Sequence, residues 1–175
     1  MKLIEISQST CVGCRLCMEI CSLVKEGECS ATKARIRIFR DEEFGNNLVS
    51  LCIQCAEVYC IKSCRDNALT RHPETGAVLL DENLCTGCKA CVTACPVGGI
   101  SYHEEKGIIV KCDLCGGDPE CVKVCSRGAI TLKDTNFDSP DRRLFMRETG
   151  KLVRKLTNKK YQGKPVSEVI GIPGG

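Results

Sequence analysis

Cysteine is the residue type with the greatest capacity for chemistry in this chain. The sequence has 17 cysteines among 175 residues, a density typical of scaffolds that depend on cysteine. Sixteen of them form four groups of four, and each group ends in the spacing C-x3-C. We call these groups quartets 1 to 4: Cys11, Cys14, Cys17 and Cys21; Cys52, Cys55, Cys60 and Cys64; Cys85, Cys88, Cys91 and Cys95; Cys112, Cys115, Cys121 and Cys125.

Disulfides, zinc and iron–sulfur clusters are the chemistries that use cysteine at this density. Disulfides require an oxidising compartment, but the start "MKLIEISQSTC" has no long apolar signal region, and the cysteine count is odd. Zinc prefers four ligands in paired C-x2-C knuckles. Quartets 2 and 4 would fit zinc, whereas three cysteines at x2-x2 spacing in quartets 1 and 3 crowd one tetrahedral ion. The pattern favours iron–sulfur clusters, with three clusters plus one zinc or one empty site as the alternative.

The spacing within a quartet has a geometric meaning. A short C-x2-C-x2-C loop wraps three thiolates around three corners of a cubane cluster, and the chain then enters a helix. The fourth cysteine therefore points away, and in two-cluster bacterial ferredoxins it ligates the other cluster. Quartet 3, "CTGCKACVTACP", matches this run together with its trailing Pro96. Quartets 2 and 4 have the same ending but longer middles.

The elements that position the quartets are expected to repeat as well. After quartets 2, 3 and 4 the chain has a small residue and then an aliphatic one, Ala68-Leu69, Gly99-Ile100 and Ala129-Ile130. Strand–turn–strand patterns join quartets 2, 3 and 4, with turns near 74–76 and 106–107. Quartet 1 is followed by a longer loop and the strand pattern "ARIRIF". Residues 1–133 therefore read as a duplicated unit of hairpin, cysteine loop and short helix.

The remaining segment, residues 134–175, differs in composition. It holds nine Lys/Arg against five Asp/Glu, whereas the rest of the chain is nearly balanced. We expect this basic extension to dock on a partner subunit, and a disordered basic tail is the alternative.

No basic, aromatic-studded face suggests nucleic acid. No apolar run reaches the length of about 18 residues that spans a bilayer. The sequence therefore predicts a cytoplasmic protein.

Four quartets, two of them with stretched middles, make the chain resemble the four-cluster ferredoxin-like electron-transfer subunits of multi-subunit oxidoreductases. The stretch "KCDLCGGDPECVKVCSRGAI" looks most similar to the small iron–sulfur subunits of tungsten enzymes of the aldehyde oxidoreductase type, which include class II benzoyl-CoA reductase-type complexes. The resemblance covers residues 11 to about 131. It implies an α+β fold of two nested bacterial-ferredoxin-like units, with quartet 1 paired with 4, quartet 2 with 3, and a C-terminal extension.

The resemblance also implies four [4Fe-4S] clusters and their ligands. We name the four ligand sets site A (Cys11, Cys14, Cys17, Cys125), site B (Cys21, Cys112, Cys115, Cys121), site C (Cys52, Cys55, Cys60, Cys95) and site D (Cys64, Cys85, Cys88, Cys91). A competing arrangement pairs quartet 1 with 2 and 3 with 4 and uses the same sixteen ligands. The hairpin between Cys64 and Cys85 favours the nested arrangement.

The function implied is electron transfer without substrate chemistry. The partners would be a large catalytic subunit, of the tungsten- or molybdenum-pterin type, and a further redox partner or ferredoxin. The residues agree, because the chain has no nucleotide-binding glycine loop and no nucleophile–base set. Alternatives are a free-standing diffusible polyferredoxin, a subunit of a hydrogenase, formate dehydrogenase or carbon monoxide dehydrogenase, and a zinc-stabilised interaction module.

Five further residues invite a functional reading. Cys29 is expected to be a non-ligating loop thiol. Lys89 and Lys111 each adjoin a quartet cysteine and could raise the potential of a cluster locally, but solvated lysines are the expected state of both. His72 and His103 are expected to be polar residues that flank turns.

Overall fold

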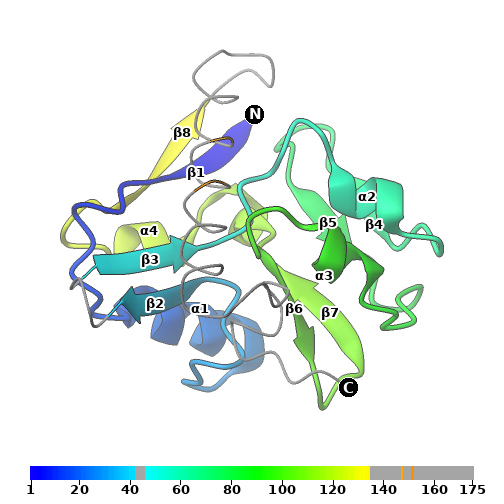
Figure 1. Ribbon diagram of the computed structural model, residues 1–175, viewed down its shortest axis with the longest axis horizontal. Coiled ribbons are helices and arrows are strands. Elements are labelled where there is room, and N and C mark those ends of the chain that lie inside the picture. The colour runs from blue at the N-terminus through cyan, green and yellow to red at the C-terminus, as the bar shows by residue number, and fades with distance from the viewer. Residues whose placement is uncertain (42–45, 135–146, 148–150, 152–175) are drawn as a thin grey trace.

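The computed structural model describes residues 1–41, 46–134, 147 and 151 (Figure 1). The described elements are β1 (Lys2–Ile6), α1 (Leu16–Glu26), β2 (Arg37–Asp41), β3 (Asn46–Ser50), α2 (Tyr59–Ser63), β4 (Leu69–Arg71), β5 (Val78–Leu80), α3 (Ala90–Ala94), β6 (Ile100–His103), β7 (Ile108–Lys111), the 3-10 turn η1 (Leu114–Gly117), α4 (Glu120–Lys123) and β8 (Ile130–Asp134). The strands form two-stranded antiparallel ribbons. Short helices and small hairpins confirm the predicted ferredoxin-like α+β fold.

Two ribbons are the hairpins expected between the later quartets. Strands β4 and β5 flank the turn after quartet 2, where Nδ1 of His72 accepts hydrogen bonds from the backbone N–H groups of Glu74 and Thr75. Strands β6 and β7 flank the turn after quartet 3. The strand expected in "ARIRIF" is also present, as β2, and it pairs with β3.

The pairing of β1 with β8 was not predicted. It joins the two ends of the described region, with Lys2 opposite Asp134 and Ile6 opposite Ile130. Ile4 at the centre of β1 is fully buried, so the ribbon is fixed to the core. Because β1 immediately precedes quartet 1 and β8 follows quartet 4, the ribbon brings these two quartets together.

The helices pack in pairs that follow the same nesting. Helix α1 contacts α4, and α2 contacts α3. Figure 1 shows α1 and α4 with the β1–β8 ribbon on one side of the molecule, and α2 and α3 with β4 and β5 on the other. Helix α1 runs for 11 residues and ends at Gly27, whose left-handed backbone (φ 76°) lets its N–H reach the Leu23 carbonyl. The other helices have only four or five residues.

Aliphatic side chains and cysteines fill the interior. One core cluster includes the fully buried Ile4, Ile36 and Leu114 together with four buried cysteines, and a smaller cluster surrounds Leu69 and Ile109. Aromatic side chains contribute little, since the buried hydrophobic residues of the described part include no Phe or Tyr. Within the described part of the chain, every helix is too short or too polar to cross a bilayer.

Candidate metal centres

Each quartet places the residue before its second cysteine in a left-handed backbone conformation. These residues are Gly13 (φ 69°), Gln54 (φ 48°), Gly87 (φ 69°) and Leu114 (φ 60°). The conformation turns the chain sharply between the two cysteines of each C-x2-C. Glycine adopts it freely, whereas a residue with a side chain pays about 1–3 kcal/mol. This position is therefore strained in quartets 2 and 4, where it holds Gln54 and Leu114. Both side chains are fully buried.

Three cavities are each lined by cysteines from two quartets. Their empty volumes, including the part that is open to solvent, are about 380, 350 and 290 Å³. Their cysteines are Cys11, Cys14, Cys17 and Cys125 in the first, Cys21, Cys112, Cys115 and Cys121 in the second, and Cys64, Cys85, Cys88 and Cys91 in the third. The structure thus brings together the residues of sites A, B and D. That these thiols ligate clusters stays a prediction.

The cysteines of site C also lie together. Burial, followed by the nearby thiols of Cys52, Cys95 and Cys60, raises the pKa of Cys55 to about 12. The loop after quartet 3 approaches quartet 2 closely, because a Cβ on Gly99 would lie only 2.6 Å from the backbone N and Cα of Cys52. This close approach seats Cys95 beside quartet 2.

Thiols crowd one another at the other sites as well. Burial is the largest cause of the raised pKa of Cys17, Cys121 and Cys91, each to about 12, and cysteines of the same set add to it. Such thiols keep their protons at neutral pH. A cationic group that replaces these protons would stabilise the buried thiolates. In the described residues, no group of three or more His, Cys, Asp or Glu is arranged to hold a single metal ion. Clustered cysteine thiols are the donor set that iron–sulfur groups use.

The four sites follow one another in a fixed order. Burial dominates the thiol pKa values, and thiols of neighbouring sites raise them further. Cys17 of site A acts on the pKa of Cys121 of site B, Cys52 of site C on that of Cys112 of site B, and Cys60 of site C on that of Cys91 of site D. Sites B and C therefore lie in the middle. The end sites each include an exposed cysteine, Cys14 in site A and Cys88 in site D.

Backbone N–H groups reach the sulfur atoms at the middle sites. The amide of Arg35 donates to Sγ of Cys21 at 3.3 Å, that of Gly99 to Sγ of Cys95 at 3.3 Å, and that of Leu114 to Sγ of Cys112 at 3.4 Å. A hydrogen bond donated to sulfur favours the thiolate form. Bonds of this kind also tune the potential of a bound cluster.

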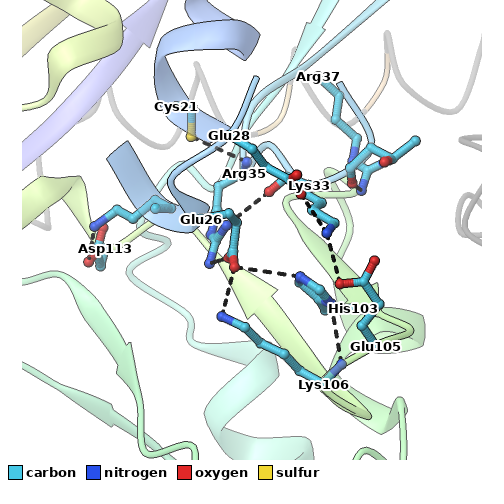
Figure 2. A network of polar contacts seen from close by, with 12 residues as sticks. Cys21, Glu26, Glu28, Lys33, Arg35, Arg37, His103, Glu105, Lys106 and Asp113 are labelled. Atoms are coloured by element: carbon cyan, nitrogen blue, oxygen red, sulfur yellow. Dashed lines mark hydrogen bonds and ion pairs between the residues drawn. The ribbon is translucent and has the colours of Figure 1, made fainter. Parts of the chain in front are cut away.

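A buried ionic network supports the Arg35–Cys21 contact (Figure 2). Glu26, at the end of α1, pairs with Arg35 at 2.5 Å and with Lys106 at 2.8 Å, and its side chain is 7 % exposed. Burial raises the pKa of Glu26, but the hydrogen bonds from Lys106 and Arg35 outweigh it and lower the pKa overall. The network ties the loop after α1 to the β6–β7 hairpin. His103 is buried against Glu26, with Nε2 3.6 Å from Oε2, so the expectation of a merely turn-flanking residue was incomplete.

The structure also shows the surroundings of Cys29, Lys89 and Lys111. Cys29 is exposed and lies outside the three cavities and the four ligand sets. Nζ of Lys89 lies 4.0 Å from the centroid of the Tyr102 ring. The expectation of a solvated Lys111 was wrong, because this residue is only 6 % exposed. The signal was the run "GIIVKC", since every residue of β7 is buried.

Known protein families match the same region. Residues 43–135 match the 4Fe-4S dicluster domain, and residues 8–31 match a 4Fe-4S binding domain. These matches confirm the [4Fe-4S] type of the cofactor and the expected likeness to ferredoxin-like iron–sulfur proteins. The number of clusters stays a prediction.

Several relatives are named as parts of oxidoreductases. The chain is 45 % identical over 111 residues to the polyferredoxin-like subunit of aliphatic sulfonate oxidoreductase from Pyrococcus furiosus, and the match covers 63 % of each protein. It is 33 % identical over 112 residues to subunit beta of NADH-dependent phenylglyoxylate dehydrogenase from Aromatoleum evansii (63 % of this chain, 25 % of the relative). It is 32 % identical over 120 residues to one chain of the anaerobic dimethyl sulfoxide reductase of Escherichia coli strain K12 (62 % and 58 %). The match spans less than two thirds of each relative.

Among solved structures, the chain is similar to the active site complex BamBC of benzoyl coenzyme A reductase with 1,5-dienoyl-CoA. The TM-score is 0.48 at 22 % identity, and 91 % of this chain and 98 % of that chain are covered. The sequence match to the dicluster domain is the firmer result, because it spans more than half of the 175 residues. The chain therefore belongs to the 4Fe-4S dicluster domain family.

Proposed function

We propose that this protein is an electron-transfer subunit that holds four [4Fe-4S] clusters, one at each of sites A to D, and carries out no substrate chemistry of its own. The observation that carries the proposal is the succession of four cysteine sets with an exposed cysteine at each end. A [4Fe-4S] cluster supplies one-electron oxidation and reduction. The sixteen quartet cysteines would be the ligands, in the nested arrangement.

The surrounding residues suit this task. Around the middle sites, Leu51, Ile53 and Leu114 are almost fully buried and keep water away. At the end sites, apolar side chains are exposed beside the cysteines: Val12 and Leu16 at site A, and Leu84 at site D. Each end thus offers a surface on which a redox partner could dock close to a site. The two surfaces would give electrons one place to enter and another to leave.

The partners belong to the same proposal. A large catalytic subunit of the tungsten- or molybdenum-pterin type would dock at one end, and a further redox partner or ferredoxin at the other. The oxidoreductase subunits among the relatives support an assembly of this kind. In this proposal residues 1–133 hold the clusters in the cytoplasm, and residues 134–175 dock on the catalytic subunit. Most of that extension lies outside the described residues.

An anaerobic redox titration of the full chain tests the electron-transfer function. Four clusters predict the uptake of about four electrons per chain in one-electron steps. A chain that takes up none would contradict the proposal and would favour the zinc-stabilised module.

Purification from the native organism tests the proposed partner. Co-elution with a large pterin-containing subunit is expected, whereas elution of the chain alone would favour a diffusible polyferredoxin.

A further inference from the structure

A buried lysine lies where sites B and C meet. Lys111 ends β7, next to Cys112, and is only 6 % exposed. Its Nζ donates hydrogen bonds to the backbone oxygen of Cys112, at 2.6 Å, and to that of Val78. In the described part of the chain, the carboxylates within ion-pair distance of a lysine pair with other lysines. A buried ammonium without a counter-charge is costly, so a different negative group should compensate it.

The cysteines of the middle sites, which are thiolates when a site is loaded, are the negative groups that face Lys111. Burial and the Cys52 thiol raise the pKa of Cys60, in site C, and Lys111 opposes them. The same holds for Cys112, in site B, where burial dominates and Lys111 again lowers the pKa. One buried cation is therefore shared by the two middle sites. Its charge would be balanced by the thiolates when both sites are loaded.

Gln54 holds this junction in place. Its Nε2 donates to the Cys112 carbonyl at 2.9 Å, and its Oε1 accepts from the Val78 N–H at 2.9 Å. Gln54 and Lys111 thus bind the same two residues. Gln54 is fully buried and takes the left-handed conformation for which quartets 1 and 3 use glycine. The strain at Gln54 is explained by a side chain that holds the Cys112 carbonyl and the Val78 N–H, and so fixes both residues to which the lysine binds.

We propose that Lys111 is a fixed positive charge that raises the reduction potentials of the two middle sites, B and C, above those of the end sites, A and D. The inference rests on the proposed function. Reduction adds one electron, and hence one negative charge, to a loaded site. A cation held in the protein interior is poorly screened, so it stabilises the reduced form more than the oxidised form. Electrons would then collect in the middle and leave from either end.

Arg71 is a second cationic residue, and it lies near site C alone. Its guanidinium donates to the Cys55 carbonyl and, at 2.9 Å, to that of Gly76. Burial lowers the pKa of Arg71, and the thiols of Cys55, Cys60 and Cys52, all of site C, act against it. Arg71 should therefore raise the potential of site C alone, whereas Lys111 should raise those of sites B and C.

Redox titrations of the anaerobically purified, cluster-loaded chain, followed by electron paramagnetic resonance, test this. Lys111→Met should change the ratio of reduced to oxidised form at least tenfold at two of the four sites. For one electron this is a fall of about 59 mV. Arg71→Met should lower only one of these two potentials. Lys62→Met is the matched control: Lys62 also lies in sequence beside cysteines of sites C and D, but it is 66 % exposed and paired with Glu57. It should shift every potential less.

The inference is wrong if Lys111→Met shifts no potential more than Lys62→Met does, or if it shifts all four alike. Should Lys111→Met fail to retain iron, Gln54→Glu carries the test, because a carboxylate beside Lys111 neutralises the same charge and should lower the same two potentials. Unchanged potentials in that variant would also overturn the inference. Failure of the proposed function looks different, since the wild-type chain itself would then take up no electrons.

Discussion

The middle sites and the end sites are built from the same cysteine loop but have different surroundings. At the end sites the left-handed position is a glycine, Gly13 or Gly87, and the cysteine after it is exposed. In quartets 2 and 4, which supply most of the middle sites' cysteines, the same position holds the buried Gln54 or Leu114. The cysteine that follows is then only partly exposed. The middle sites thus combine a buried side chain at this position with a partly covered second cysteine. At the end sites Asn47 lies against Gly13 and the Gly107 carbonyl against Gly87, so there is no room for a side chain, and the second cysteine is exposed.

The largest effect is expected from substitutions of two cysteines in quartet 4 that belong to different sites, one to an end site and one to a middle site. Cys125→Ser should remove the cluster of site A, which is about four iron atoms per chain, and leave site B loaded. Cys121→Ser, four residues earlier in quartet 4, should do the opposite. Iron analysis combined with electron paramagnetic resonance distinguishes the two. If Cys125→Ser altered the cluster of Cys112 and left the other intact, the nested arrangement would be wrong.

The buried ionic network beside site B is expected to have the next largest effect. Glu26→Gln leaves Arg35 and Lys106 without their shared carboxylate, which should destabilise the fold by about 3 kcal/mol. It should also loosen the Arg35–Cys21 contact. Glu28→Gln is the control, because Glu28 is 53 % exposed in its pair with Lys33. Exposed pairs contribute little. Denaturant unfolding of the cluster-loaded chains should show the difference, and equal midpoints would argue against a supporting role for the network.

A smaller effect is expected in the rates at which the sites lose iron. The exposed Cys14 and Cys88 should let an oxidant or chelator reach sites A and D first. Iron release should therefore have two phases, with about half of the iron in the faster one. Stopped-flow absorbance in the visible range would measure both phases. A single phase would show that the middle sites are no better shielded than the end sites.

Local patterns in the sequence predicted the four quartets, the hairpins and the short helices, since each depends on neighbouring residues. The pairing of quartets into sites A to D was implied only by the resemblance to a known family. The β1–β8 ribbon was missed because it joins residues more than a hundred positions apart, such as Lys2 and Asp134. The burial of Lys111 was missed for a related reason. A lysine normally marks an exposed position, and the apolar run before Lys111 was the signal against it. The hydrogen bond from Lys111 to the Val78 carbonyl, which helps to enclose it, joins residues that are distant in sequence. The network around Glu26 likewise joins segments that are distant in sequence.

Iron and acid-labile sulfide analysis of the full chain, purified without oxygen, tests the central claim most directly. Four [4Fe-4S] clusters predict about 16 iron atoms and about 16 sulfides per chain, in a brown protein whose iron is held by sites A to D. About four zinc ions in a colourless protein would contradict the account. A content near 12 iron atoms and 12 sulfides would show that one of the four cysteine sets holds no cluster.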